Sequence, residues 1–153
     1  MTKNESLTFD ITLSGTYWNK KPEYSVWLDD TQIERKIITT ASDELFTVKF
    51  DPTLSEGPHI FKVRLENKEP TDTKLLDDDT IEKDMLLNIE SIVIDDIDLG
   101  NLKWTKSYFL MDEMTYIDNE YTNKMDSCVN LGLNGSYIIE FSSPYYLWLL
   151  ENL

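Results

Sequence analysis

A two-residue alternation of apolar and polar side chains is the feature that most limits what this chain can fold into. Leu7, Phe9, Ile11 and Leu13 alternate with polar residues, and this period places every second side chain on one face of a β-strand. Four further segments are candidate strands: Tyr24–Leu28, Phe46–Phe50, His59–Leu65 and Ser136–Phe141. Short strands separated by Gly, Pro and Asp predict an all-β fold, an antiparallel, jelly-roll-like β-sandwich. A length of 153 residues suits one such domain.

Two stretches depart from this regular pattern. The apolar phase slips by one residue between Ile89 and Ile92, which predicts a β-bulge near Glu90 and Ser91. Residues 104–134 are rich in aromatic, acidic and amide side chains but show little alternation. We expect this region to form a long ordered excursion from the sandwich, and long ordered loops often carry binding residues.

The C-terminal segment Tyr145–Leu150 is apolar throughout and is predicted to be a strand. A strand that is apolar on both faces is either central in a core or paired with another chain. The first alternative makes this segment the buried last strand of the sandwich. The second makes it a docking segment, in which Tyr145, Tyr146 and Trp148 contact a partner subunit.

The formal net charge of −15 narrows the classes of partner. A surface this anionic repels nucleic acid and anionic lipid, so we expect no nucleic-acid partner and no membrane binding. No apolar run approaches the roughly 20 residues of a membrane-spanning helix, and the N-terminus MTKNESLTFD does not have the pattern of a signal peptide. We therefore expect a protein made in the cytoplasm, whose acidic surface either favours solubility or attracts cations.

Few residues are suited to catalysis. His59 is the only histidine, and no Gly-x-Ser-x-Gly motif is present to provide a serine nucleophile beside it. Cys128 is the only cysteine, and the sequence indicates no basic partner that would activate its thiol. One cysteine and one histidine cannot supply the usual ligands of zinc. The sequence therefore predicts that the protein is not an enzyme.

An acidic stretch, LLDDDTIEKDMLLNI, leads into an apolar strand at residues 75–89. Calcium takes roughly six to eight oxygen ligands from carboxylates, amides, carbonyls and water. Candidate ligands cluster in and just before this stretch: Glu66, Asn67, Asp77, Asp78, Asp79 and Asp84. The spacing of an EF-hand is absent, because the loop has no glycine at the required position. The two alternatives are a calcium site and a solvated acidic loop.

Three segments add a family resemblance when they are taken together: Pro22–Asp30, His59–Asn67 and Asp84–Ile92. Their order and character resemble the calcium-dependent xylan-binding module family, a jelly-roll β-sandwich found as an appendage of polysaccharide-degrading enzymes. In that family a Pro-led strand ends in an Asp-Gly turn, a later strand opens with His and closes in Asn-Asp, and an Asp begins a third strand. The resemblance covers residues 5 to about 100. It implies a single domain, residues 1–153, with a module-like core and a C-terminal extension at residues 101–153.

By this resemblance, Asn67 and Asp84 lie at a calcium site, where the metal bridges protein oxygens and sugar hydroxyl groups. The chain departs from the family at that site, because Lys68 stands where the family has an aspartate. Further departures are at Asp30, Met85 and Leu86. The resemblance therefore implies the fold together with an altered cation site, in which Asp77–Asp79 would act as replacement ligands.

Two further segments, Lys83–Ile89 and Ser143–Leu153, are similar to stretches of short proteins encoded by marine tailed bacteriophages, including those of cyanobacteria. This second resemblance implies a virion component, such as a head decoration or a tail accessory, that is made in the host cytoplasm. Its partners would be other virion proteins or further copies of itself.

Two function hypotheses follow, and they belong to different classes. The first is a non-enzymatic bacteriophage protein with a carbohydrate-module fold that serves as a virion structural or accessory component. The second is a calcium-dependent glycan-binding module that recognises a polysaccharide on the host surface. Trp18 and Trp27 bear on the second hypothesis, because an exposed indole offers a platform for a sugar ring whereas a buried one belongs to the core.

Overall fold

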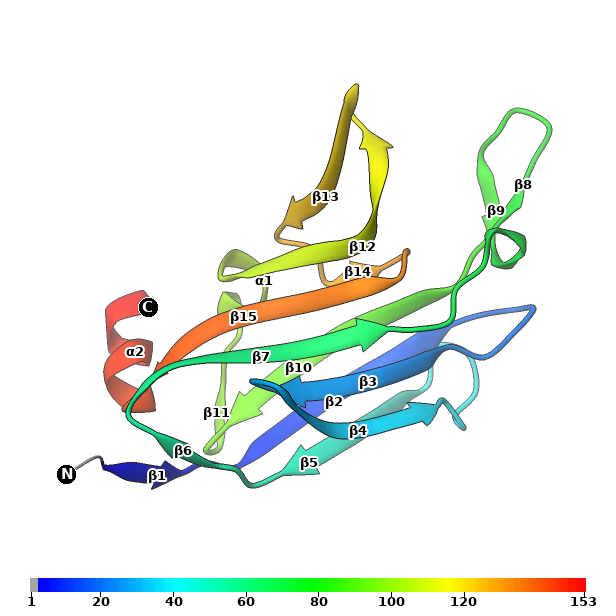
Figure 1. Ribbon diagram of the computed structural model, residues 1–153. Coiled ribbons are helices and arrows are strands. Elements are labelled where there is room, and N and C mark those ends of the chain that lie inside the picture. The colour runs from blue at the N-terminus through cyan, green and yellow to red at the C-terminus, as the bar shows by residue number, and fades with distance from the viewer. Residues whose placement is uncertain (1–2) are drawn as a thin grey trace.

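The computed structural model describes residues 3–153 and contains two antiparallel sheets that face each other (Figure 1). The larger sheet has six strands in the order β13 (Glu120–Asp126), β12 (Ser107–Ile117), β15 (Gly135–Ser143), β7 (Gly57–Leu65), β3 (Glu23–Leu28) and β4 (Thr31–Ile37). The smaller sheet contains β11 (Ile97–Asp98), β10 (Leu86–Ile94), β2 (Phe9–Thr16) and β5 (Leu45–Phe50), with β14 (Asn130–Leu131) paired to β10. The predicted all-β antiparallel sandwich is confirmed.

The remaining elements are short and lie at the ends of the sandwich. Two small ribbons pair β1 (Asn4–Ser6) with β6 (Thr53–Ser55) and β8 (Lys74–Leu75) with β9 (Ile81–Lys83). The helical elements are η1 (Pro70–Asp72), α1 (Leu102–Thr105) and α2 (Tyr145–Asn152). Within the described part of the chain, none of the helices has the length and apolarity needed to cross a membrane.

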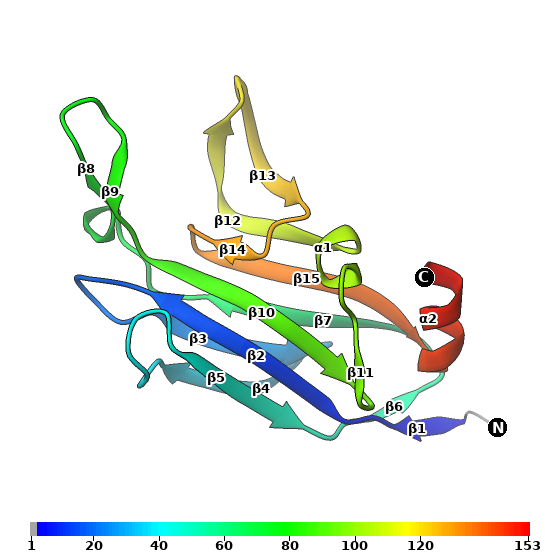
Figure 2. The same ribbon diagram turned by 180° about the vertical axis from the view of Figure 1, so that it is seen from behind.

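Two hairpins, β8–β9 and β12–β13, stand away from the sandwich on the same side (Figure 1). Seen from behind, they again rise from one side, and α2 lies at the end of the sandwich opposite β8–β9 (Figure 2). The space at the foot of these two hairpins and the surface of α2 are therefore separate places on the molecule.

The core lies between the two sheets and is built from alternate residues of their strands. Phe9, Ile11 and Leu13 of β2 are at most 1% exposed, and β7 alternates in the same way from His59 to Leu65. Each large apolar side chain buried in this way stabilises the fold by about 1.5–3 kcal/mol. The two-residue period seen in the sequence is thus the period of core packing.

The predicted bulge in β10 is confirmed. The register with β2 shifts between Ile89 and Ser91, so that Ile89 and Ile92 are both buried although they are an odd number of positions apart. Glu90 is exposed at the shift, and its carboxylate accepts a hydrogen bond from Ser14 Oγ at 2.9 Å.

The region between residues 104 and 134 is more regular than its sequence indicates. The first part of β12, Ser107–Met111, pairs with β15 and belongs to the larger sheet. Beyond Met111 the strand continues away from the sandwich and pairs with β13 alone. The excursion is therefore a β-hairpin whose base is a sheet strand. The rings of Tyr116 and Tyr121 pack across it with centroids 5.1 Å apart.

The prediction of a strand at Tyr145–Leu150 is wrong, because this segment forms the helix α2. Tyr145 and Leu149, one helical turn apart, are buried against the end of the sandwich, whereas Leu147 and Leu150 are 57% and 70% exposed. A short run that is apolar at every position has no period, so it does not distinguish a helix from a buried strand. The alternative that made the segment the last strand of the sandwich is thereby excluded.

Candidate functional site

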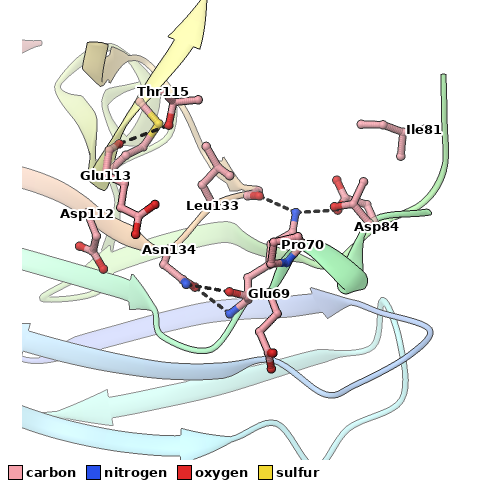
Figure 3. Close-up of a pocket in the computed structure, with 13 residues that line it drawn as sticks. Glu69, Pro70, Ile81, Asp84, Asp112, Glu113, Thr115, Leu133 and Asn134 are labelled. Carbon is pink, nitrogen blue, oxygen red and sulfur yellow. Dashed lines mark hydrogen bonds and ion pairs between the residues drawn. The ribbon is translucent and has the colours of Figure 1, made fainter. Parts of the chain in front are cut away.

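A pocket of about 690 Å³ lies at the foot of the two hairpins, lined by residues of both β9 and β12 (Figure 3). We call it the inter-hairpin pocket. Its lining residues come from four segments: residues 68–73, 81–84, 111–115 and 132–134. In Figure 3, Asp112 and Glu113 lie on one side of the pocket, and Ile81 and Asp84 lie on the other. Roughly 300–1,000 Å³ is the usual size of a small-molecule site.

Lys68 is held in the wall of this pocket by both its backbone and its side chain. Its backbone N–H donates to Asn134 Oδ1 at 2.8 Å, and its carbonyl accepts from Asn134 Nδ2 at 2.9 Å. Its side chain is 8% exposed, and the ammonium donates to Asp84 Oδ1 at 2.6 Å and to the Gly132 carbonyl at 2.5 Å. These partners are required, because an unpaired buried charge would cost several kcal/mol.

Asp84 is the anion that balances Lys68. Besides the Lys68 ammonium, its Oδ1 accepts from Thr73 Oγ1 at 2.7 Å and from the Met85 backbone N–H at 2.8 Å. Burial opposes ionisation, but these hydrogen bonds and the positive charge of Lys68 outweigh it and hold the pKa of Asp84 below its ordinary value. Asp84 is therefore an ionised carboxylate at neutral pH.

Three other carboxylates line the pocket, and two of them are paired. Glu69 binds Lys20 at 2.7 Å, and Asp112 accepts two hydrogen bonds from the Arg64 guanidinium at 2.8 and 3.1 Å. Glu113 has no ion-pair partner within residues 3–153. The pocket therefore presents a slight excess of negative charge, together with apolar surface from Met111, Leu133 and other residues.

The five predicted calcium ligands do not fit a calcium site in this arrangement. Asn67 is already bonded through both ends of its amide, because Oδ1 accepts from the Glu23 N–H and Nδ2 donates to the Lys21 carbonyl. Asp84 carries the Lys68 ammonium. Asp77, Asp78 and Asp79 are exposed in the turn of the β8–β9 hairpin, where Asp78 accepts two hydrogen bonds from Thr80.

The described residues also group no other side chains into a metal site. Between residues 3 and 153, no three side chains of the types His, Cys, Asp and Glu converge to hold an ion. Calcium prefers several oxygens around one point, and the nearest equivalent here is the set of oxygens that surrounds Lys68 Nζ. The assignment of the five residues to calcium stays a prediction that chelation experiments can test.

The two predicted sugar-stacking residues, Trp18 and Trp27, both contact other side chains or the backbone of the protein. Trp18 is 41% exposed, but its indole N–H donates to the Asp72 carbonyl at 2.9 Å and Lys83 Nζ lies 5.4 Å from its ring. Trp27 is half-buried, and Lys62 Nζ lies 5.5 Å from its ring. Neither indole lines the inter-hairpin pocket. Their role as sugar platforms stays a prediction.

The side chains of His59 and Cys128 are both engaged in hydrogen bonds within the fold. The imidazole of His59 is buried between Asp29 Oδ2, 2.7 Å from Nδ1, and the Ser55 carbonyl, 2.6 Å from Nε2. The thiol of Cys128 donates to the Asn130 carbonyl, and its burial raises its pKa. Neither residue lines the inter-hairpin pocket.

The three predicted docking residues lie on different sides of α2. Tyr145 is fully buried, Trp148 packs partly against the core with its ring 6.2 Å from that of Phe141, and Tyr146 is 49% exposed. Of the three, Tyr146 is therefore the most accessible to a partner. The exposed face of α2 also includes Leu147 and Leu150, which sequence reasoning did not single out.

Sequence reasoning also missed Gly132 and Asn134, which bond to Lys68, and Thr73, which bonds to Asp84. They lie in irregular segments, where no periodicity marks a residue as buried or bonded. The dipeptide Asn134-Gly135 carried the only signal, since Asn-Gly is typical of turns. Gly135 is required for packing as well, because a Cβ atom there would lie 2.4 Å from the Leu110 carbonyl oxygen.

Comparison with known proteins identifies the fold. No protein-family model matches the chain, and no curated protein matches it. A solved structure described as vCBM60 in complex with galactobiose superposes with a TM-score of 0.52 at 16% identity, covering 90% of this chain and 98% of the other. The selenomethionine form of vCBM60 superposes with a TM-score of 0.54 at 14% identity, covering 87% of this chain and 89% of the other.

The second of these structures is described in connection with a circular permutation that links two families of calcium-dependent carbohydrate-binding modules. At this level of identity, the similarity establishes that the chain has the fold of a carbohydrate-binding module. The fold part of the resemblance to xylan-binding modules is thereby confirmed.

Proposed function

We propose that the protein binds a neutral saccharide, without catalysis, in the inter-hairpin pocket. The observation that carries this proposal is the position of the Lys68–Asp84 pair in the wall of that pocket, on a fold shared with a module that binds galactobiose. Sugars present many hydroxyl groups, and each needs a donor or an acceptor when it leaves water. Lys68 and Asp84 supply one of each.

The lining of the pocket favours a neutral ligand over an acidic one. Glu113 adds a carboxylate without an ion-pair partner within residues 3–153, and the whole chain carries a formal net charge of −15. An anionic sugar such as a uronate would be repelled by both. The apolar side chains of Met111 and Leu133 can contact the C–H faces of a sugar ring.

Binding to a panel of saccharides tests this proposal. The panel contains xylan, galactan, their short oligosaccharides, galactobiose, and polygalacturonate as the acidic control, and isothermal titration calorimetry measures each affinity. We expect binding of at least one neutral saccharide and no binding of polygalacturonate. Leu133→Trp, which places a larger side chain in the pocket, should weaken binding at least about tenfold.

Leu75→Trp is the matched control, because Leu75 is also exposed but lies on β8 outside the pocket lining. It should bind like the unmodified protein. Failure of every neutral saccharide to bind would refute the proposal, and so would unchanged binding by Leu133→Trp.

A second candidate function is docking within a virion, and the exposed apolar face of α2 favours it. Tyr146, Leu147 and Leu150 are 49–70% exposed on one short helix, and exposed apolar patches are typical of interaction surfaces. On this proposal the protein is a structural or accessory component of a bacteriophage particle, made in the host cytoplasm. Because α2 lies at the end of the sandwich opposite β8–β9 (Figure 2), docking there would leave the inter-hairpin pocket accessible, and one protein could do both.

A further inference from the structure

The surroundings of Lys68 Nζ resemble those of a bound cation. Two oxygens contact it, Asp84 Oδ1 and the Gly132 carbonyl, at 2.6 and 2.5 Å. The Lys68 backbone is fixed on both sides by Asn134, and the contacts to Asp84 and the Gly132 carbonyl hold the ammonium at the end of the side chain. The protein therefore carries a fixed positive charge, supplied by its own chain, in the wall of the inter-hairpin pocket.

The Lys68–Asp84 pair has unused hydrogen-bonding capacity. An ammonium has three N–H donors, and the described residues accept only two of those of Lys68. All three hydrogen bonds to the Asp84 carboxylate go to Oδ1, and Oδ2 has no donor within residues 3–153. One donor and one acceptor of opposite charge are thus left next to each other where both residues line the pocket.

We propose that the Lys68 ammonium serves as a built-in cation, so that the saccharide binding proposed above needs no metal ion and recognises two adjacent hydroxyl groups. One hydroxyl oxygen accepts the third N–H of Lys68, and its neighbour donates to Asp84 Oδ2. This inference rests on the proposed function, and it specifies the ligand chemistry of the same pocket.

A divalent cation is excluded from this position by charge and by space. The ammonium already contacts Asp84 Oδ1 and the Gly132 carbonyl, and two positive charges held at contact distance repel each other strongly in a partly buried site. A ligand with a single hydroxyl group would satisfy only one member of the pair and leave the other unpaired. Sites built from polar pairs reject such ligands strongly.

The first experiment measures saccharide binding with the panel described above, in EDTA and in millimolar CaCl₂. We expect the same affinity in both solutions. Lys68→Met keeps an unbranched side chain one atom shorter but removes its donors and charge, and it should weaken binding about tenfold or more. Lys74→Met, which removes an exposed lysine of β8 outside the pocket lining, should bind normally.

The outcomes separate this inference from the proposed function. Binding that is lost in EDTA and restored by CaCl₂ would support the proposed function and overturn the inference. Binding that is metal-independent but unchanged in Lys68→Met would also overturn the inference. Binding of no saccharide at all would refute both. Treatment of a bound saccharide with periodate, which cleaves between adjacent hydroxyl groups, should abolish its binding.

The second experiment does not depend on any saccharide. Lys68→Asp removes the ammonium and adds a carboxylate to the same wall as Asp84, Thr73 and the Gly132 carbonyl, which together form a set of oxygens of the kind that calcium prefers. We expect CaCl₂ to raise the melting temperature of Lys68→Asp and to leave that of the unmodified protein unchanged. If Lys68→Asp does not fold without calcium, Lys68→Asn provides a neutral oxygen ligand for the same comparison. A calcium-dependent rise in the unmodified protein would overturn the inference.

Discussion

At the scale of single residues, the only histidine of the chain acts as a structural cation. Both nitrogens of His59 face acceptor oxygens, those of the Asp29 carboxylate and the Ser55 carbonyl, so both hydrogen bonds form together when the imidazole is protonated. Asp29 has a positive φ of 53° and also accepts the Ile60 N–H at 2.8 Å. The imidazolium therefore connects the β3–β4 turn to the end of β6.

This arrangement makes stability depend on pH through His59. Burial lowers the pKa of the imidazole, but the hydrogen bonds to Ser55 and Asp29 and the charges of Asp29 and Glu5 outweigh burial, so its pKa is raised above the ordinary value of about 6.5. Since the native state holds this proton more tightly than the unfolded state, the stabilisation is complete below about pH 6.5 and declines as pH rises through the native pKa.

The prediction concerns the difference between the unmodified protein and His59→Gln. The free energy of unfolding, measured in urea between pH 5.5 and 8.5, should be lower in the variant by about 1–3 kcal/mol at the acid end. This difference in the free energy of unfolding should decrease toward pH 8.5. A constant gap, or an NMR titration that places the pKa of His59 below 6.5, would contradict this account.

At the scale of elements, the sequence predicts a strand correctly where one face of the strand is buried in the core. It does not predict the secondary structure of a segment whose conformation depends on contacts with distant parts of the chain. Alternation located β2 and β7, and a one-residue slip located the bulge of β10, because core packing imposes the period directly. The same reasoning placed a strand at Tyr145–Leu150 of α2, where every residue is apolar and no period exists. The same reasoning predicted no regular strand for β12, because the outer half of this strand does not pack on the sandwich and so shows no alternation.

The candidate site could be predicted only in part, for a related reason. Asp84 was identified by resemblance, and Lys68 was identified as a departure from it. Their contact joins residues 16 apart, and the roles of Gly132 and Asn134 depend on bringing together segments 64 and 66 residues apart. Pairing over such distances follows from the sheet topology, which the alternation of a single sequence does not determine.

The exposed face of α2 leads to a prediction about docking. Leu147→Ser with Leu150→Ser removes apolar surface from the exposed face, so the free energy of unfolding should change by no more than about 0.5 kcal/mol per substitution. If the protein self-associates through α2, sedimentation velocity should show oligomers for the unmodified protein and monomers for this double variant.

Leu149→Ala is the matched control on the inner face of the same helix, where Leu149 is 6% exposed. It should cost about 2–5 kcal/mol of stability and leave association intact as long as the protein is folded. A monomeric unmodified protein at high concentration would exclude self-association, and docking would then require a different virion protein.

At the scale of the whole molecule, the charge of −15 should oppose folding. Lys20, Arg35 and Arg64 are already paired with carboxylates, and the excess of acidic over basic side chains leaves many exposed carboxylates to repel one another. Salt screens this repulsion, with a Debye length of about 10 Å at 0.1 M and about 30 Å at 0.01 M. The native state concentrates the charge more than the unfolded chain does, so screening should stabilise it.

We therefore expect the melting temperature to rise as NaCl increases from about 0.01 to 0.3 M, by about 2–4 °C for each 1 kcal/mol of repulsion relieved. Choline chloride should act like NaCl, because screening does not depend on the identity of the cation. Asp77→Asn with Asp79→Asn removes two exposed charges from the β8–β9 turn, and asparagine tolerates the positive φ of 65° at position 79. This variant should melt higher than the unmodified protein at low salt and respond less to NaCl. A rise specific to calcium, abolished in this variant, would instead show that the acidic turn binds that ion.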